Sequence, residues 1–199
     1  TDPVVSYEYE AETPRYTLRD LPDTIDYVLI THGHADHLSF ETLVQLRHKI
    51  KQIVVPRNGS GLLEDPSLKL MLKRLGFANV TEIDEMEMIE IDGGTITAIP
   101  FLGEHADLNI RTKAAHLICL GERSILCAAD SCNLETKLYE HVNSLVSDID
   151  LLFLLPYKQT AWGESVAETI LYCLCDMGLK VGHATRSLTE CFRQAKADM

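Results

Sequence analysis

The sequence predicts an α/β fold built as a sandwich, with mixed sheets in the middle and helices covering them. In the first part of the chain, short apolar strands alternate with helices whose apolar residues recur every three to four positions. After residue 80 the pattern changes to alternating apolar and polar residues joined by turns that contain Gly, which is typical of hairpins. Hairpins interleaved with helices indicate sheets that are covered by helices.

The first part of the chain contains the apolar strands and two capped helices. Its expected elements are the end of a strand at 2–5, a buried strand at 27–30, a helix at 40–50, a short strand at 52–56 and a helix that begins at Ser67. Ser39 suits the cap of the first helix because its side chain can accept a hydrogen bond from an N–H of the first turn. Gly76 suits the left-handed position that ends the second helix.

The second part of the chain contains the hairpins. Their strands are expected at 80–83, 87–91, 95–101, 114–120 and 123–129, followed by a helix at 134–146, a strand at 150–155 and a helix at 164–177. Asp92-Gly93-Gly94 and Gly121-Glu122 supply the turn residues that connect antiparallel strands.

Composition limits the function classes. The 199 residues suit one domain spanning 1–199, with 46% hydrophobic and 24% charged residues. The net charge is −12 and no basic run occurs, which argues against nucleic-acid binding because phosphates are bound by clustered Lys and Arg. No apolar stretch is long enough to cross a membrane. The six cysteines show no disulfide framework and no signal peptide is visible, so the expected location is the cytoplasm.

The densest chemical signal is the loop that directly follows the strand at 27–30. The segment Thr31-His32-Gly33-His34-Ala35-Asp36-His37 contains three imidazoles and a carboxylate within six positions. Both groups are ligands for zinc or iron. Because Asp36 and His37 are adjacent, they cannot both aim where His32 and His34 aim. The loop therefore predicts two neighbouring metal positions.

Further ligands are expected where later strands end near this loop. Gly103-Glu104-His105 follows the strand at 95–101, and Asp130 follows the strand at 123–129. A carboxylate at the end of an apolar strand suits the bridging of two cations. The alternative for Asp130 is a cap of the following helix.

These motifs resemble those of the metallo-β-lactamase superfamily. The segments Phe101-Leu102-Gly103-Glu104-His105-Ala106-Asp107-Leu108 and Ala129-Asp130-Ser131-Cys132-Asn133-Leu134 most resemble its diiron β-hydroxylase branch, known from chloramphenicol biosynthesis. The resemblance runs from about residue 2 to residue 154 and implies the αββα sandwich of that superfamily. Members normally begin with strands that precede the segment equivalent to Asp2-Pro3, so the chain is expected to lack the first strands and to be part of a longer polypeptide.

The resemblance implies a ligand set but leaves one position open. In most of these hydrolases a histidine is the third ligand of the first metal, and His105 would fill that role. In the diiron branch it is a glutamate, which favours Glu104. Two histidines and one carboxylate suit ferrous iron, whereas three imidazoles suit a hydrolytic zinc. Neighbouring residues of an extended chain face opposite ways, so only one of the two is expected to bind.

The second metal is expected to bind Asp36, His37 and Asp130, with His183 as the candidate for a last ligand. Asp36 and Asp130 are also the residues expected to act in catalysis. The other three histidines, His48, His116 and His141, are expected to be structural, with His116 packed in the core.

The leading hypothesis is a binuclear metalloenzyme in which two irons activate oxygen and hydroxylate a substrate, either a small molecule or an aminoacyl group tethered to a carrier protein. The alternative is a zinc- or manganese-dependent hydrolase of an ester, thioester, lactone or phosphoester, with Asp130 helping to hold an attacking hydroxide. The third hypothesis is a non-catalytic domain that binds metal for stability or for partner binding.

Overall fold

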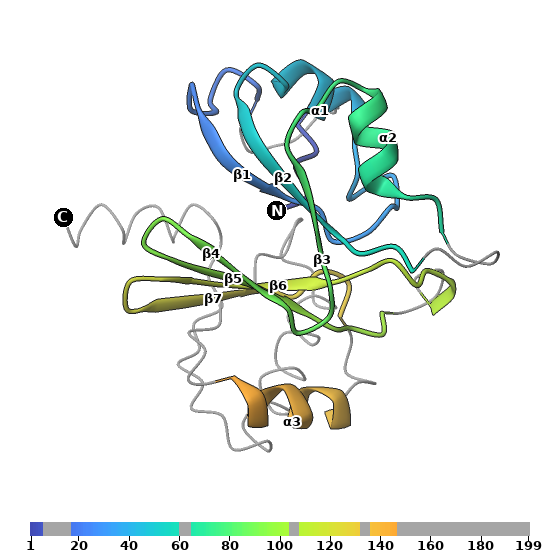
Figure 1. Ribbon diagram of the computed structural model, residues 1–199, viewed down its shortest axis with the longest axis vertical. Helices are drawn as coiled ribbons and strands as arrows, with labels where there is room; N and C mark the ends of the chain where they lie inside the picture. The colour runs from blue at the N-terminus through green and yellow to red at the C-terminus, as the bar shows by residue number, and fades with distance from the viewer. Residues whose placement is uncertain (6–16, 60–64, 104–107, 132–135, 147–199) are drawn as a thin grey trace, which may run out of the picture.

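The computed structural model describes residues 1–5, 17–59, 65–103, 108–131 and 136–146, and Figure 1 shows their arrangement. Its elements follow in the order β1 (Ile25–Leu29), α1 (Phe40–Leu46), β2 (Ile50–Pro56), α2 (Leu68–Arg74), β3 (Val80–Ile83), β4 (Met88–Ile91), β5 (Gly94–Ile99), β6 (Ala115–Leu120), β7 (Arg123–Cys127) and α3 (Thr136–Leu145).

The strands form two sheets of different type. β1, β2 and β3 make a parallel sheet, whereas β4, β5, β6 and β7 make an antiparallel sheet with its strands in chain order. Helices α1 and α2 connect the parallel strands and lie on the outer side of their sheet, and α3 lies beyond the antiparallel sheet (Figure 1). The described elements therefore form the four layers of the expected αββα sandwich.

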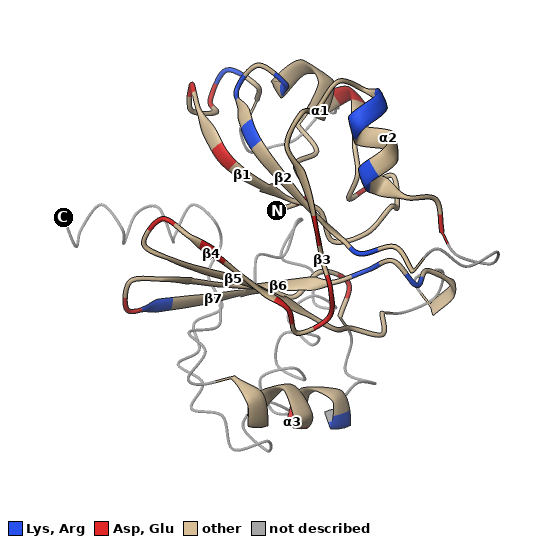
Figure 2. Cartoon of the chain, in the orientation of Figure 1, with Lys and Arg blue, Asp and Glu red and all other residues tan. Residues whose placement is uncertain are grey.

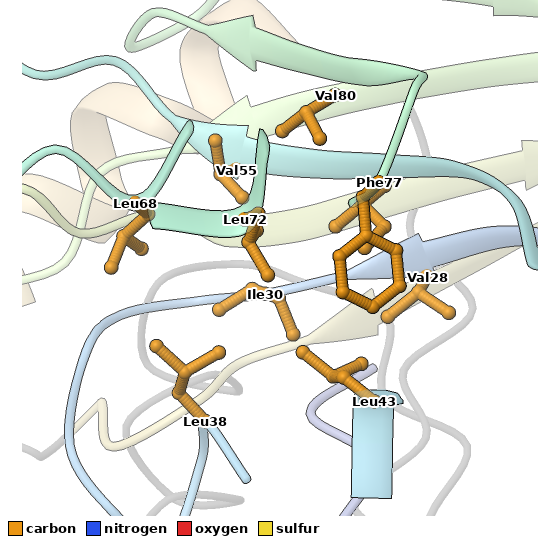
Figure 3. Packing of buried hydrophobic residues seen from close by; sticks show 10 residues of the cluster. Val28, Ile30, Leu38, Leu43, Val55, Leu68, Leu72, Phe77 and Val80 are labelled. Carbon is orange, nitrogen blue, oxygen red and sulfur yellow. The ribbon is translucent and has the colours of Figure 1, made fainter. Parts of the chain in front are cut away.

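The core of the first two layers is formed by the helices and the outer face of the parallel sheet (Figure 3). Its buried members are Val28, Ile30, Leu38, Leu43, Ile53, Val55, Leu68, Leu72, Phe77 and Val80. The side chains of Ser39 and Ser67 accept hydrogen bonds from the first turns of α1 and α2, at 3.2 and 3.3 Å. Both helix starts are therefore fixed as the cap pattern predicts.

A second core joins the two sheets. Its buried members, which come from both sheets, are Leu29, Val54, Ile83, Ile96, Ala98 and Ala114. The backbone N–H of Ala114 donates to the carbonyl of Thr31 at 2.9 Å, which ties the end of β1 to the start of β6. The end of β5 pairs with the same part of β6, Ile99 opposite Ala115, and so does the end of β7. The loops that follow β1, β5 and β7 therefore leave the sandwich at one edge.

Several element boundaries differ from the sequence prediction. The helix predicted at 40–50 ends at Leu46, because Lys49 donates to the Leu46 carbonyl in a turn and β2 already begins at Ile50. Among the apolar residues of the two helices, Val44 on α1 and Leu70 on α2 are 42% and 66% exposed. Residues 2–5 are placed beside β1 but are not in a strand. The strand expected at 150–155 and the helix at 164–177 lie outside the described residues.

Figure 2 shows acidic residues along β1, β3 and β4, and basic residues on α2 and in the loop after β2. Exposed ion pairs such as Lys51–Asp26 at 2.6 Å connect neighbouring elements. Exposed pairs of this kind each contribute at most about 1 kcal/mol to stability. None of the described helices has the length and hydropathy of a membrane-spanning segment.

Candidate binuclear metal centre

The histidine-rich loop is a tight turn directly after β1. The backbone N–H groups of His37 and Leu38 both donate to the carbonyl of His34, at 3.1 and 2.8 Å. The turn brings three rings together, with centroid distances of 4.7 Å from His32 to His34 and 4.2 Å from His32 to His37. The His32 side chain is fully buried. Local backbone hydrogen bonds therefore shape the turn that brings the imidazoles together.

One group of donor atoms, here called the first donor set, consists of His32 Nε2, His34 Nδ1 and Asp130 Oδ2. The two ring nitrogens are 2.9 Å apart, and Asp130 Oδ2 lies 3.5 Å from His32 Nε2. The three residues offer ligand atoms that all lie within 4.8 Å of one another. Such a group surrounds a space of the size that a single metal ion takes.

A second donor set lies on the other side of Asp130. Asp130 Oδ1 is 3.0 Å from His37 Nε2, and Asp36 Oδ2 is 3.8 Å from the same nitrogen. The Asp36 side chain is 81% exposed, so this set faces solvent while the first set is buried at His32. Asp130 thus offers one carboxylate oxygen to each set, which is the arrangement of a bridging ligand.

Asp130 reaches this position because the chain turns sharply after β7. Ala129 adopts a φ of 54°, in the left-handed region that residues other than Gly rarely occupy. The turn is closed by a hydrogen bond from the Ser131 N–H to the Ala128 carbonyl, at 3.2 Å. Residues 132–135, which separate Asp130 from the described part of α3, lie outside the described residues, so the alternative interpretation of Asp130 as a helix cap stays a prediction.

The electrostatics of the site follow from this packing. Burial lowers the pKa of His32, and the neighbouring His37 lowers it further. Burial also acts to lower the pKa of His37, but the hydrogen bonds that its ring donates to the carboxylates of Asp130 and Asp2 outweigh burial and raise the pKa to about 10. Burial acts to raise the pKa of Asp130, but the hydrogen bond with His37 and the nearby rings outweigh it and hold the pKa below its usual value.

The sequence did not identify two residues that support this loop, Asp2 and Thr31. Asp2 accepts a hydrogen bond from the Thr31 hydroxyl at 2.7 Å and lies 3.0 Å from His37 Nδ1. In the sequence, Thr31 is only the first residue of the motif, and the pattern at 2–5 predicts the end of a strand. No local pattern in the sequence indicates this contact, because it joins Asp2 to residues about 30 positions away.

The remaining sequence candidates divide into two groups. Glu104, His105 and His183 lie outside the described residues. His116 is fully buried on β6, which confirms its expected place in the core, while His48 and His141 are exposed on the surface.

The described residues fit a pair of metal ions. The donor atoms are imidazole nitrogens and carboxylate oxygens, which are ligands for iron and zinc. Without a metal, the proton that the raised pKa keeps on His37 balances the carboxylates of Asp2 and Asp130. A cation bound between the imidazole rings and Asp130 would supply this positive charge instead and would displace the proton from His37.

Two sheets between helix layers, with converging histidine and aspartate donors at one edge, define a metallo-β-lactamase type of protein. The family model of the beta-lactamase superfamily domain matches residues 1–185. The chain belongs to this superfamily.

Among its relatives, the 4-amino-L-phenylalanyl-[CmlP-peptidyl-carrier-protein] 3-hydroxylase of Streptomyces venezuelae is 44% identical over 155 residues, which are 77% of this chain and 29% of that protein. The crystal structure of CmlA, a diiron beta-hydroxylase from Streptomyces venezuelae, matches with a TM-score of 0.67 and 44% identity over 75% of this chain and 29% of that chain. The resemblance to the diiron branch is therefore confirmed, and the chain spans less than a third of the length of this relative.

Two further similarities are more limited. Igni18, a metallo hydrolase from Ignicoccus hospitalis, matches with a TM-score of 0.54 at 18% identity over 81% of this chain and 64% of that chain, which shows the shared fold alone. A stretch of 53 residues, 27% of this chain, is 83% identical to the bifunctional uridylyltransferase/uridylyl-removing enzyme of Rhodopseudomonas palustris. That stretch covers 6% of the enzyme, which is too little to carry its activity to this chain.

Proposed function

We propose that this chain carries the active site of a diiron hydroxylase whose substrate is an aminoacyl group tethered to a carrier protein. The proposal of two metals is supported by the position of Asp130. Its two carboxylate oxygens face different imidazoles, at 3.5 Å from His32 Nε2 and 3.0 Å from His37 Nε2. The choice of reaction and substrate is supported by the 44% identity to a hydroxylase that acts on a residue bound to a peptidyl carrier protein.

The proposed ligands fall into two groups joined by Asp130. His32, His34 and Glu104 would hold the first iron, and Asp36 and His37 the second. Two histidines and one carboxylate leave coordination positions open, which suits ferrous iron and oxygen chemistry. When bound, the irons supply the redox chemistry for oxygen activation, while the protein supplies geometry and electrostatics.

The surroundings of the two donor sets fit a site that is closed on one side. Phe101 contacts His32 edge-on, with ring centroids 6.0 Å apart, and both side chains are buried. The Asp36 side chain, in contrast, is mostly exposed. We infer that Phe101 excludes water behind the first iron, and that the substrate approaches from the side of Asp36.

The test is metal analysis combined with turnover of the full-length chain. Protein isolated without added metal is expected to contain close to two irons per chain. With a chemical reductant, dioxygen and an aminoacyl carrier protein, it is expected to add one oxygen atom to the aminoacyl group, as measured by mass spectrometry. Two zincs together with hydrolysis of activated esters or thioesters would instead show a hydrolase and refute the proposal.

The third ligand of the first metal can be decided with a pair of neighbouring variants. Glu104→Ala is expected to lose the first iron, because it removes the carboxylate, whereas His105→Ala is expected to keep both irons. Each variant serves as the control for the other, and iron per chain is the measurement. Loss of metal in His105→Ala alone would assign three imidazoles to the first metal and favour a hydrolytic zinc.

A further inference from the structure

Asp2 contacts the end of β1 through several atoms at once. Its Oδ1 accepts a hydrogen bond from the Thr31 backbone N–H at 2.8 Å, and its Oδ2 accepts one from the Thr31 hydroxyl at 2.7 Å. The same Oδ2 lies 3.0 Å from Nδ1 of His37. The Asp2 side chain is only 12% exposed, and its φ of 41° is sparsely populated for any residue except Gly.

The Thr31 hydroxyl extends this contact to a second imidazole. A carboxylate only accepts hydrogen bonds, so the hydroxyl proton is donated to Asp2. The oxygen of Thr31 can then accept from Nδ1 of His32, which lies 3.0 Å away. His32 therefore carries its proton on Nδ1 and keeps the lone pair of Nε2, the atom that belongs to the first donor set.

The same reasoning applies to His37. Its Nδ1 donates to Asp2 Oδ2, so Nε2 is the nitrogen available to the second donor set. A histidine binds a metal only through a nitrogen that carries no proton, and the partner of the other nitrogen decides which one this is.

We propose that Asp2 and Thr31 act as a positioning pair, in which one carboxylate, directly and through a hydroxyl, fixes the protonated nitrogen of one imidazole in each donor set. This inference rests on the proposed binuclear site. It assigns a role to two residues that bind no metal themselves, and it links the two metal positions through one acidic side chain.

A merely structural role for Asp2 is the competing explanation, and the backbone contacts allow a separation. The segment 1–5 is also held by hydrogen bonds from the Asp2 N–H to the Leu29 carbonyl, at 2.8 Å, and from the Val5 N–H to the Thr42 hydroxyl, at 3.2 Å. These bonds do not involve the Asp2 carboxylate. A variant that changes only the carboxylate therefore leaves the segment anchored.

Asp2→Asn is the variant that tests the role of the carboxylate. Its amide keeps the size and can still accept from the Thr31 N–H, but its NH₂ group cannot accept from a hydroxyl or an imidazole. Both rings then favour the opposite tautomer, with a proton on Nε2. We expect the affinity for Co²⁺ to fall about 10- to 100-fold at both positions.

Thr31→Val separates the two metal positions. It removes the hydroxyl from a fully buried side chain of nearly the same shape, so the link to His32 is lost while the contact from Asp2 to His37 remains. We expect weaker Co²⁺ binding at the first position only, and Thr31→Ser is expected to restore it because it returns the hydroxyl.

The experiment is a titration of the metal-free full-length chain with Co²⁺, followed by visible absorption, together with the thermal midpoint of each metal-free variant. Wild-type protein that binds no Co²⁺ would refute the proposed binuclear site itself. If the wild type binds two Co²⁺, wild-type affinity in Asp2→Asn would overturn the positioning role, and so would equal affinity in Thr31→Val and Thr31→Ser. Should Asp2→Asn fail to fold, the two Thr31 variants decide the question alone.

Discussion

Replacing Asp130 by Asn is expected to reduce the metal content from two ions per chain to one or none. The side chain places one oxygen 3.5 Å from His32 Nε2 and the other 3.0 Å from His37 Nε2. Asn keeps the shape but loses the negative charge and one of the two oxygens. Because the loss of a partner that only supports a ligand already costs about 10- to 100-fold in affinity or activity, we expect turnover to fall by more than about 100-fold.

Two other carboxylate variants serve as controls for Asp130→Asn. Asp36→Asn is expected to lose only the second metal, because its carboxylate approaches His37 and is not part of the first donor set. Glu122→Gln, on the exposed turn between β6 and β7, is expected to keep both. Metal per chain and turnover are measured for all three. Two tightly bound metals in Asp130→Asn would mean that Asp130 merely accepts a hydrogen bond from His37.

The sequence predicted the centre of this site because ligands that are close in the chain need little tertiary information. His32, His34 and His37 follow a strand that can be recognised from its apolar run, and a tight turn brings their rings together wherever the strand lies. Asp130 was identified for a related reason, because a carboxylate at the end of a buried strand is costly unless a cation or a donor is near.

The supporting residues could not be predicted in the same way. The role of Asp2 depends on its lying beside the end of β1, on a bond to the Thr31 hydroxyl and on a φ of 41°, none of which a local pattern encodes. The exact end of α1 was missed for a similar reason. Apolar residues continue past Leu46 at helical spacing, but the parallel pairing of Ile50 with Ile25 begins β2 there. Tertiary pairing overrode the local preference.

Replacing His116 by Leu is expected to remove one loss of stability on acidification, so that between pH 8 and pH 5 the change in the free energy of unfolding is more favourable in the variant than in the wild type by about 2 kcal/mol. His116 lies on β6, opposite Ala98 on β5 and Cys127 on β7. Its side chain is fully buried, and neither ring nitrogen has a hydrogen-bond partner among the residues that the structure describes. Burial of this kind lowers the pKa of His116 from 6.5 to about 4.

The direction of the effect follows from where the proton binds. Above pH 6.5 the ring is neutral in both the folded and the unfolded chain. As the pH falls from 6.5 toward 4, the unfolded chain takes up a proton that the folded chain excludes, so stability is lost. The shift to about 4 corresponds to a loss of about 2 kcal/mol at pH 5 and about 3 kcal/mol when the transition is complete.

Leu at this position has no proton to bind, so the loss should disappear from the variant. Urea denaturation of the metal-free proteins at pH 8 and pH 5 gives the two free energies, and the wild type is expected to lose about 2 kcal/mol more than His116→Leu. His37, whose pKa is raised, acts in the opposite sense, but it is present in both proteins and cancels. The exposed His141 is the matched control, since His141→Gln should retain the wild-type dependence. Equal losses in wild type and His116→Leu would show that the folded protein accepts a proton at His116, which is incompatible with a neutral ring sealed between the two sheets.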